Sequence, residues 1–398
     1  MKKLLLATAL TAVAASGAYA GSHGNEVKIG IALGFTGPLE SLAPPMAGGA
    51  ELAMKEASDA GNFLGGTMVT PVRGDSTCVD ASVATAVVER LITSDGVKGI
   101  MGAMCSGATG AALANVAVPN GMVMISPSAT SPGLSTVEDN GLFFRTAPSD
   151  ARQGEVMTSV IMDRGIKTVA VTYTNNDYGK GLADSFVAAF TAAGGTVTAN
   201  VPHEDGKADY SAEVATLASA GGEALVVAGY VDQGGSGVMQ GALDTGAFDL
   251  FVLPDGMVAD VLEEKFGSAI DGSFGQYPAS VGEGRTRYVD LATAAGVNAG
   301  SVYSGEAYDA AALILLAMQA AGSAEPGDYV GKIFDVANAP GEKILPGELG
   351  KAFEILAAGG DIDYEGASSV ELIGPGESGG SFREIIMEGG KVTEVGYR

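Results

Sequence analysis

The chain has 398 residues and a formal net charge of -25, with 47 acidic against 22 basic side chains. Nucleic acid and anionic membrane surfaces are poor partners for such a chain, because both are bound through basic patches. The length exceeds what one hydrophobic core usually serves, so two lobes are expected.

The first residues have the features of an export signal. Lys2 and Lys3 precede an apolar run over residues 4–13, and Ala18-Tyr19-Ala20 fits a small-x-small cleavage site. We expect residues 1–20 to be removed from an exported protein. The alternative is an uncleaved anchor. No later stretch approaches the ~20 uninterrupted apolar residues that span a bilayer.

Two cysteines are present, Cys78 and Cys105. An even pair in an exported chain predicts one disulfide, because the compartments outside the cytoplasm are oxidising. The bond should add roughly 3 to 4 kcal/mol to stability in the chain-entropy model. It should also brace the loop that carries Ser106. The alternative is a pair of free, buried thiols.

Strand-like and helix-like segments alternate from residue 27 onward. The first strands are expected at 27–33, 67–73, 98–103 and 122–126. A loop rich in glycine and proline at 34–45 precedes a helix at 48–57. A second helix starts at its N-cap Asp80, and a third, rich in small residues, follows Cys105. Such alternation calls for a parallel sheet with helices on both faces.

The same alternation starts again after Arg145. Helices are expected at 150–164, 179–193, 210–220, 236–244 and 258–266, and strands at 168–173, 196–201, 224–228, 250–253 and 273–277. This pattern predicts a second doubly wound unit.

Beyond Pro278 the chain turns helical, and it ends in a predicted hairpin. The helices are expected at 285–295, 306–321, 328–336 and 347–358, and the hairpin strands at 382–388 and 391–395. If the late helices pack on the first lobe and the hairpin on the second, the chain crosses between the lobes three times. The predicted fold class is therefore α/β, with two doubly wound parallel-sheet lobes joined by a three-strand hinge beside a cleft.

Enzyme chemistry is disfavoured by the side chains that the chain lacks. Its two histidines are His23, near the predicted mature start, and His203, in a predicted loop after Pro202. A metal cluster or a Ser-His-Asp relay needs more imidazoles. The one G-x-S-x-G match, at 376–380, precedes no histidine and is expected to be a turn. Without a P-loop or a G-x-G-x-x-G after a strand, we expect no nucleotide, cofactor, metal or catalysis.

Polar residues gather instead where predicted strands end, which is where open parallel sheets bind small ligands. The candidates are Ser106, Ser128, Ala129 and Thr130 in the first lobe and Tyr178, Tyr230 and Asp255 in the second. Hydroxyls and backbone N–H groups facing a carboxylate across a cleft suit a zwitterion, since each charge then meets a partner. Taken singly, each residue also fits an ordinary role as a helix cap, a surface aromatic or a turn residue.

Several short motifs together resemble the leucine/isoleucine/valine-binding proteins, which are type I periplasmic binding proteins that serve ABC importers. In chain order they are the pair Cys78 and Cys105 followed by Ser106, ISPSAT at 125–130, NNDYGKG at 175–181, AGY at 228–230 and LPDG at 253–256. The resemblance runs from about residue 27 to the C-terminus. We expect lobe 1 to comprise 21–146 plus 278–372, and lobe 2 to comprise 147–277 plus 373–398.

The resemblance implies a role for each matching residue of the first lobe. Ser106 and Thr130 would bind a ligand carboxylate through their hydroxyl and backbone N–H groups. The carbonyl group of Ser128 or Ala129, together with Thr130, would meet the ammonium group of the ligand.

For the second lobe, the resemblance implies that Asp255 supplies the negative charge that balances the ammonium group. Tyr178 and Tyr230 would close this lobe over the ligand. Two departures leave the ligand's side chain open. Leu42 follows Gly37-Pro38 where the family often has an aromatic residue, and Asp255 stands where glutamate is common.

The implied function is that of a monomeric receptor in the periplasm. It would trap a small amino acid, branched-chain or otherwise aliphatic, by hinge closure and present it to the permease subunits of an ABC importer. One alternative is a binding protein for an amide, urea or an aromatic acid. Another is a sensor that reports its ligand to a regulatory partner.

Overall fold

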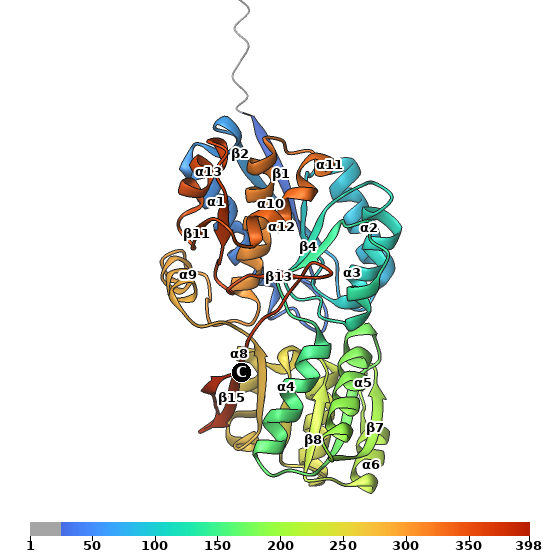
Figure 1. The fold of residues 1–398 in the computed structure, drawn as a ribbon. Helices are drawn as coiled ribbons and strands as arrows, with labels where there is room; N and C mark the ends of the chain where they lie inside the picture. Colours follow the sequence, from blue (N-terminus) through green and yellow to red (C-terminus); the bar gives the residue numbers. More distant parts are fainter. Residues whose placement is uncertain (1–24) are drawn as a thin grey trace, which may run out of the picture.

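The computed structural model describes residues 25–398, so the predicted signal peptide and His23 lie outside the described residues. The described residues form two lobes, each built on a seven-stranded sheet with helices on its faces. In Figure 1 the upper lobe, lobe 1, contains the start of the described chain and the late helices. The lower lobe, lobe 2, contains the middle of the chain together with the C-terminal strands.

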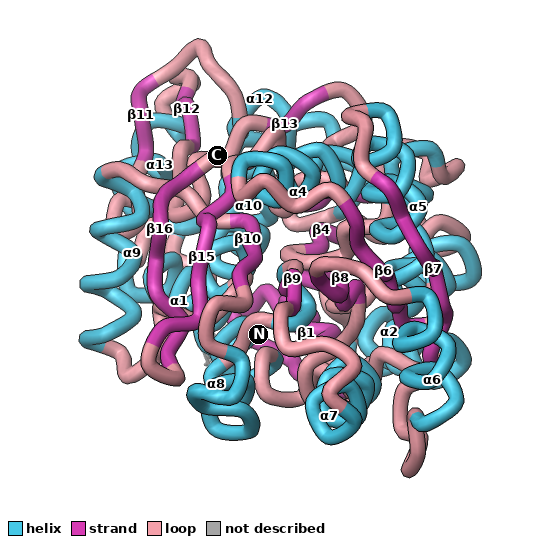
Figure 2. The backbone as a smooth tube through the Cα atoms, turned by 90° about the horizontal axis from the view of Figure 1, so that it is seen from below, coloured by secondary structure: helices cyan, strands magenta, loops and turns pink. Residues whose placement is uncertain are grey.

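Sheet A lies in lobe 1 and has the strand order β13-β14-β5-β4-β3-β1-β2. Its strands are β1 (Glu26–Leu33), β2 (Met68–Asp75), β3 (Ile100–Gly102), β4 (Met124–Ser126), β5 (Phe143–Arg145), β13 (Leu372–Ile373) and β14 (Glu377–Ser378). Sheet B lies in lobe 2 and has the order β16-β15-β10-β9-β8-β6-β7, which can be followed across Figure 2. Its strands are β6 (Thr168–Thr174), β7 (Thr196–His203), β8 (Ala224–Ala228), β9 (Phe251–Leu253), β10 (Phe274–Pro278), β15 (Phe382–Glu388) and β16 (Lys391–Tyr397).

Helices cover both sheets. Those of lobe 1 are α1 (Ala43–Ala60), α2 (Ala81–Arg90), α3 (Ser106–Ala112), α9 (Glu283–Ala294), α10 (Ser304–Ala321), α11 (Pro326–Tyr329), α12 (Ile333–Ala337) and α13 (Leu349–Ala357). Those of lobe 2 are α4 (Asp150–Asp163), α5 (Asp177–Ala192), α6 (Ser211–Ala220), α7 (Gly234–Thr245) and α8 (Asp260–Phe266). A separate parallel pair, β11 (Glu342–Ile344) and β12 (Ile362–Tyr364), completes lobe 1.

Both sheets repeat one doubly wound topology, which confirms the predicted fold class. The parallel order β2-β1-β3-β4-β5 of sheet A recurs as β7-β6-β8-β9-β10 in sheet B. Antiparallel strands are added only at one edge of each sheet, so the sheets are mixed. The strand order reverses between β1 and β3 and between β6 and β8. In such sheets a crevice forms outside the carboxyl ends of the strands at these reversals.

The chain crosses between the lobes after β5, after β10 and after β14, as the sequence predicted. The last two crossings run side by side, because the Ser381 hydroxyl donates a hydrogen bond of 2.7 Å to the Ala279 carbonyl oxygen. The turn predicted at 376–380 lies at 374–376 instead, and the following Glu377 and Ser378 form β14, which pairs with β5 and β13. We therefore propose that lobe 1 extends to about residue 379 and not only to 372.

Helix α10 forms the core of lobe 1. Every residue from Ser304 to Gln319 is buried. Gly49 of α1 lets the two helices approach closely, because a Cβ atom there would lie 2.2 Å from the Ser304 carbonyl oxygen.

No single helix among residues 25–398 is long and apolar enough to cross a membrane. The helical segments Ser304–Ala321 and Pro326–Ala337 reach the required length and hydropathy only when taken together, and they are bent by 85° relative to each other.

Two local predictions differ from the structure for clear reasons. Helix α1 begins at Ala43, earlier than residue 48, because Pro44 and Pro45 occupy its first turn, where helices need no backbone N–H donor. His203 does not lie in a loop but ends β7, an edge strand that tolerates Pro202. Burial lowers the pKa of His203 to about 4, so its imidazole is neutral near pH 7.

The lobes are in contact along the cleft. Asp232 of lobe 2 accepts a hydrogen bond from the Ser41 N–H at 2.9 Å, and its own N–H donates to the Pro38 carbonyl oxygen at 3.2 Å. On the α8 side, the Asn298 amide donates to Asp260 at 3.0 Å. The structure therefore describes the closed arrangement of the two lobes.

Candidate functional site

A small cavity lies between the lobes. Its lining residues are Leu39, Leu42, Met104, Cys105, Ser106, Ser128, Tyr178, Tyr230, Asp255, Gly256 and Tyr303. Apart from the last, they follow the ends of β1, β3 and β4 in sheet A and of β6, β8 and β9 in sheet B. The cavity thus lies at the strand-order reversals of both sheets. A wider groove between α6 and α7 contains none of the predicted site residues.

The structure brings together most of the residues that the sequence singled out. Ser106 and Ser128 line the cavity from lobe 1, and Tyr178, Tyr230 and Asp255 line it from lobe 2. The remaining two predicted residues, Ala129 and Thr130, are fully buried next to Ser128 and do not line the cavity.

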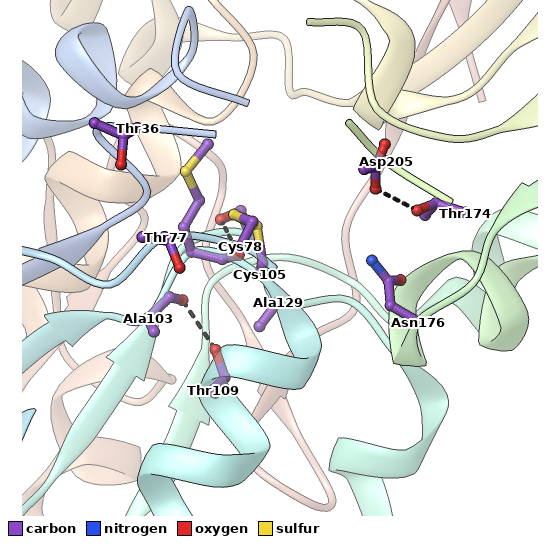
Figure 3. The surroundings of a disulfide bond; sticks show 12 residues. Thr36, Thr77, Cys78, Ala103, Cys105, Thr109, Ala129, Thr174, Asn176 and Asp205 are labelled. Carbon is purple, nitrogen blue, oxygen red and sulfur yellow. Dashed lines mark hydrogen bonds between the residues drawn. A yellow bond between two sulfur atoms is a disulfide. The ribbon is translucent and has the colours of Figure 1, made fainter. Parts of the chain in front are cut away.

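The predicted disulfide is present between Cys78 and Cys105, whose Cα atoms lie 5.4 Å apart. It joins the loop after β2 to the start of α3, so that it braces Ser106, the first residue of that helix. Figure 3 shows the bond on the lobe 1 side of the cleft, facing Thr174 and Asn176 of lobe 2.

Replacing both Cys78 and Cys105 by serine is expected to lower the free energy of unfolding by about 3 to 4 kcal/mol, because the unfolded chain regains the entropy of the open loop. Urea denaturation followed by circular dichroism measures the change. A reducing agent should destabilise the wild-type protein by a similar amount and leave the double variant unchanged. Equal stability of the two oxidised proteins would contradict this prediction.

Serine hydroxyls tie the strand ends of lobe 1 together. The Ser126 hydroxyl accepts the Ala129 N–H at 2.9 Å and donates to the Ala103 carbonyl oxygen at 2.6 Å. The Ser106 hydroxyl accepts the Ser131 N–H at 3.1 Å, which leaves its own hydrogen available to a ligand. In residues 25–398 the buried Thr130 hydroxyl has no hydrogen-bond partner.

The buried Arg145 fixes this loop from behind. Its guanidinium donates hydrogen bonds of 2.9 Å to the carbonyl oxygens of Ala129 and Ser131, and it also binds Ser135 and Glu377. Because the peptide bond is trans, the Thr130 N–H points away from the Ala129 oxygen and hence away from Arg145. The Ala129 carbonyl, one of the two predicted ammonium partners, thus already accepts a hydrogen bond within lobe 1.

Asp255 is the acidic group of the cavity and is 3% exposed. Its Oδ1 accepts hydrogen bonds of 2.8 Å from the Gln153 amide and the Tyr178 hydroxyl, and its Oδ2 accepts one of 2.6 Å from the Tyr303 hydroxyl. Burial raises the pKa of Asp255, and these three donors oppose that rise by stabilising the ionised form.

Two aromatic rings form the wall beside Asp255. The Tyr178 and Tyr230 rings are stacked, with centroids 5.1 Å apart and planes 7° from parallel. The N-cap residue Asn176 accepts the Gly179 N–H at 3.0 Å and so fixes the helical turn that carries Tyr178. Gly256 lets this wall form, because a Cβ atom there would lie 2.8 Å from the Tyr178 hydroxyl.

A second acid, Asp150, lies close to Asp255 and was not predicted. It is the first residue of α4 and fully buried, and its carboxylate oxygens have no well-formed hydrogen bond among the described residues, although the Thr130 hydroxyl lies close enough to lower its pKa. Burial, with the negative charge of Asp255 next in importance, raises the pKa of Asp150 well above its ordinary value. Its own N–H donates to the Thr130 carbonyl oxygen at 2.8 Å.

The site therefore has one carboxyl group in its lining, Asp255, with the buried Asp150 near it, and the free hydroxyl hydrogen of Ser106 on the lobe 1 side. The Ser128 hydroxyl donates to the Met104 carbonyl oxygen at 2.8 Å. A buried carboxylate is stabilised by a cation, and hydroxyl and N–H donors are stabilised by an anion. The described residues contain no group of three or more His, Cys, Asp or Glu side chains that could hold a metal ion.

Two residues of the site were not predicted from the sequence. Asp150 was missed because an acid in a first helical turn is ordinary, and Tyr303 was missed because no motif marks it.

Two α/β lobes that close on a cavity at the reversals of both sheets define a ligand-binding protein of the two-lobed, hinged class. Residues 26–332 match the family model described as periplasmic binding protein, and the chain belongs to that family. The members are ligand-binding transport proteins and not enzymes, in accord with the prediction from the histidine content.

Curated relatives that the chain matches include proteins named for leucine, isoleucine and valine binding. Leu/Ile/Val-binding protein homolog 3 of Brucella melitensis is 34% identical over 238 residues, which cover 58% of this chain and 61% of the relative. Homolog 1 of the same organism is 32% identical over 279 residues, covering 69% of this chain and 72% of the relative. The first match thus spans about three fifths of that relative's length.

Solved structures share the fold at low sequence identity. The leucine-binding protein LivK of Thermotoga maritima is similar with a TM-score of 0.79 at 22% identity, covering 93% of this chain and 98% of its own. A solute-binding protein of R. palustris in complex with 4-hydroxybenzoate has a TM-score of 0.74 at 17% identity, covering 94% of this chain and 97% of its own. The fold is therefore common to proteins with different ligands.

Proposed function

We propose that this protein binds a small aliphatic amino acid in the cavity between its lobes and is the periplasmic receptor of an ABC importer, exported after cleavage near Ala20. Asp255 is the observation that carries the proposal. Its carboxylate is buried in the cavity wall opposite the hydroxyls of Ser106 and Ser128. An ammonium group is the ligand chemistry that offsets such a buried negative charge.

The ligand carboxylate is assigned to lobe 1. The Ser106 hydroxyl, which lines the cavity and retains a free hydrogen, is its first partner. The Thr130 hydroxyl and N–H are assigned to it as well, from their buried position next to the cavity lining, where the hydroxyl also stabilises the ionised form of Asp150. The Ser128 carbonyl meets the ammonium group from the same side. Charge-assisted hydrogen bonds of this kind are about twice as strong as neutral ones.

The ligand ammonium is assigned to Asp255, with Asp150 as a second acid behind it. Tyr178 and Tyr230 cover the ligand from lobe 2, where their stacked rings exclude water from the charges. A ligand that contacts both walls favours the closed arrangement over the open one by its differential affinity.

The side chain of the ligand is assigned to an apolar surface formed by Leu39, Leu42 and Met104 of lobe 1. Leu42 stands where the leucine/isoleucine/valine-binding proteins often have an aromatic residue, and it makes this surface aliphatic. This surface favours a compact aliphatic side chain.

An aromatic acid is the strongest competing ligand, since a protein of this fold is solved with 4-hydroxybenzoate. Benzoates have a carboxylate but no ammonium group. In this cavity they would leave Asp255 without a counter-ion and add a second negative charge beside it. Amides and urea lack the charge that would balance Asp255 and are disfavoured for the same reason.

A thermal-shift assay tests this proposal. L-alanine, L-valine, L-leucine and L-isoleucine are compared with benzoate, 4-hydroxybenzoate, acetamide and urea at 1 mM. At least one of the amino acids should raise the melting temperature by several degrees, because ligand at 1,000 times its Kd stabilises a protein by about 4 kcal/mol. A shift produced only by the benzoates or the amides would contradict the proposal. Loss of cellular uptake of that amino acid on gene deletion would favour an importer over a sensor.

A further inference from the structure

Tyr303 reaches from lobe 1 to the acid of lobe 2. Its neighbour Ser304 starts α10, and the Ser304 hydroxyl donates to the Pro45 carbonyl oxygen of α1 at 3.2 Å. The close approach of Gly49 to the Ser304 carbonyl oxygen fixes the same backbone against α1. The Tyr303 side chain nevertheless donates its hydroxyl hydrogen to Asp255 Oδ2, across the cleft, at 2.6 Å.

The backbone of Tyr303 adopts a conformation that a bulky residue rarely takes. Its φ is 64°, in the left-handed region, and its side chain is 4% exposed. Such a conformation persists only where the surrounding structure determines it, and it occurs most often at functional sites. Here it directs the Tyr303 ring into the cavity instead of into the core of lobe 1.

The other two donors to Asp255 do not cross the cleft. Tyr178 and Gln153 belong to α5 and α4 of lobe 2, so they stay with Asp255 when the lobes separate. Oδ1 accepts two hydrogen bonds and Oδ2 accepts one, which leaves an acceptor site on Oδ2 beside the Tyr303 hydroxyl. The bond from Tyr303 therefore orients the free lone pair of Asp255, and it exists only when the lobes are closed.

We propose that Tyr303 is a positioning residue that couples lobe closure to the assembly of the acidic subsite, by orienting Asp255 from the opposite lobe. The proposal deepens the proposed function and rests on it for the role of Asp255 toward a ligand. The coupling of Tyr303 to closure can be measured without any ligand. The proposal for Tyr303 and the proposed function can therefore fail separately.

The matched pair of variants is Tyr303→Phe and Tyr178→Phe. Each removes one hydroxyl donor to Asp255 and keeps the ring, but only the first removes a contact between the lobes. Spin labels on Glu89→Cys of α2 and Ser219→Cys of α6, both exposed positions, report the distance between the lobes by electron double resonance. Tyr303→Phe should lower the ratio of closed to open protein about tenfold, as expected for a hydrogen bond to a charged group. Tyr178→Phe should leave that ratio unchanged.

A kinetic arm uses L-leucine as the probe. Both variants should weaken binding, but Tyr303→Phe should do so by faster dissociation at an unchanged association rate, because its contact forms only after closure. In an Asp255→Ala background, Tyr303→Phe should have no further effect on the distance distribution. A folded Tyr303→Phe protein with the wild-type distances, both ligand-free and saturated with leucine, would overturn the proposal. So would equal effects of Tyr303→Phe and Tyr178→Phe on closure.

Discussion

Replacing Asp255 by alanine is expected to lower the affinity for the aliphatic amino acid by about 3 to 5 kcal/mol, a factor of roughly 10² to 10³ or more in Kd. The ligand ammonium would then be buried without its principal counter-ion, and the hydroxyls of Tyr178 and Tyr303 would lose their acceptor. Isothermal titration calorimetry measures the change directly.

Asp249→Ala is the control for this prediction, because Asp249 is an exposed acid of lobe 2 that precedes β9, whereas Asp255 follows that strand. It removes the same charge from the protein but not from the cavity, so its affinity should equal that of the wild type. If Asp255→Ala binds the amino acid as tightly as the control does, the assignment of the ammonium group to Asp255 is wrong.

Replacing Arg145 by leucine is expected to lower the free energy of unfolding by about 3 to 5 kcal/mol. The change would leave Glu377 in a largely buried position without its cation, and it would remove the donor to the carbonyl oxygens of Ala129 and Ser131. Ligand affinity should fall as well, because the loop that carries Thr130 loses its anchor. Chemical denaturation and calorimetry measure the two effects.

Two further variants separate the causes. Arg152→Leu removes an exposed arginine paired with Glu155 and should change stability by less than about 1 kcal/mol. Arg145→Leu combined with Glu377→Leu should recover part of the lost stability, since no buried charge is then unpaired. A double variant as unstable as Arg145→Leu alone would show that the carbonyl contacts, and not the ion pair, dominate.

The alternation of long apolar strands with amphipathic helices made the architecture predictable. β8, for example, lies at Ala224–Ala228 as expected, because its uninterrupted apolar run is bounded by polar turns. Elements held by tertiary pairing were not predictable. β13 and β14 have two residues each, too few for any periodic pattern, and they exist because β5 offers an edge to pair with.

The candidate site was predictable where a residue directly follows a strand. Tyr230 and Asp255 come within a few residues of the ends of β8 and β9, so the parallel topology alone brings them together. Asp150 and Tyr303 reach the same place from α4 and from the segment before α10. Their positions depend on how the lobes close and on a left-handed backbone, neither of which leaves a signal in the sequence.

The central claim is that opposite charges of one ligand meet separate walls of the cavity. Calorimetric titration with L-leucine, with 4-methylpentanoate, which lacks the ammonium group, and with 3-methylbutylamine, which lacks the carboxylate, tests it most directly. Leucine should bind at least 100-fold more tightly than either analogue, because each analogue leaves one wall unpaired. Binding of 4-methylpentanoate as tight as that of leucine would contradict the account.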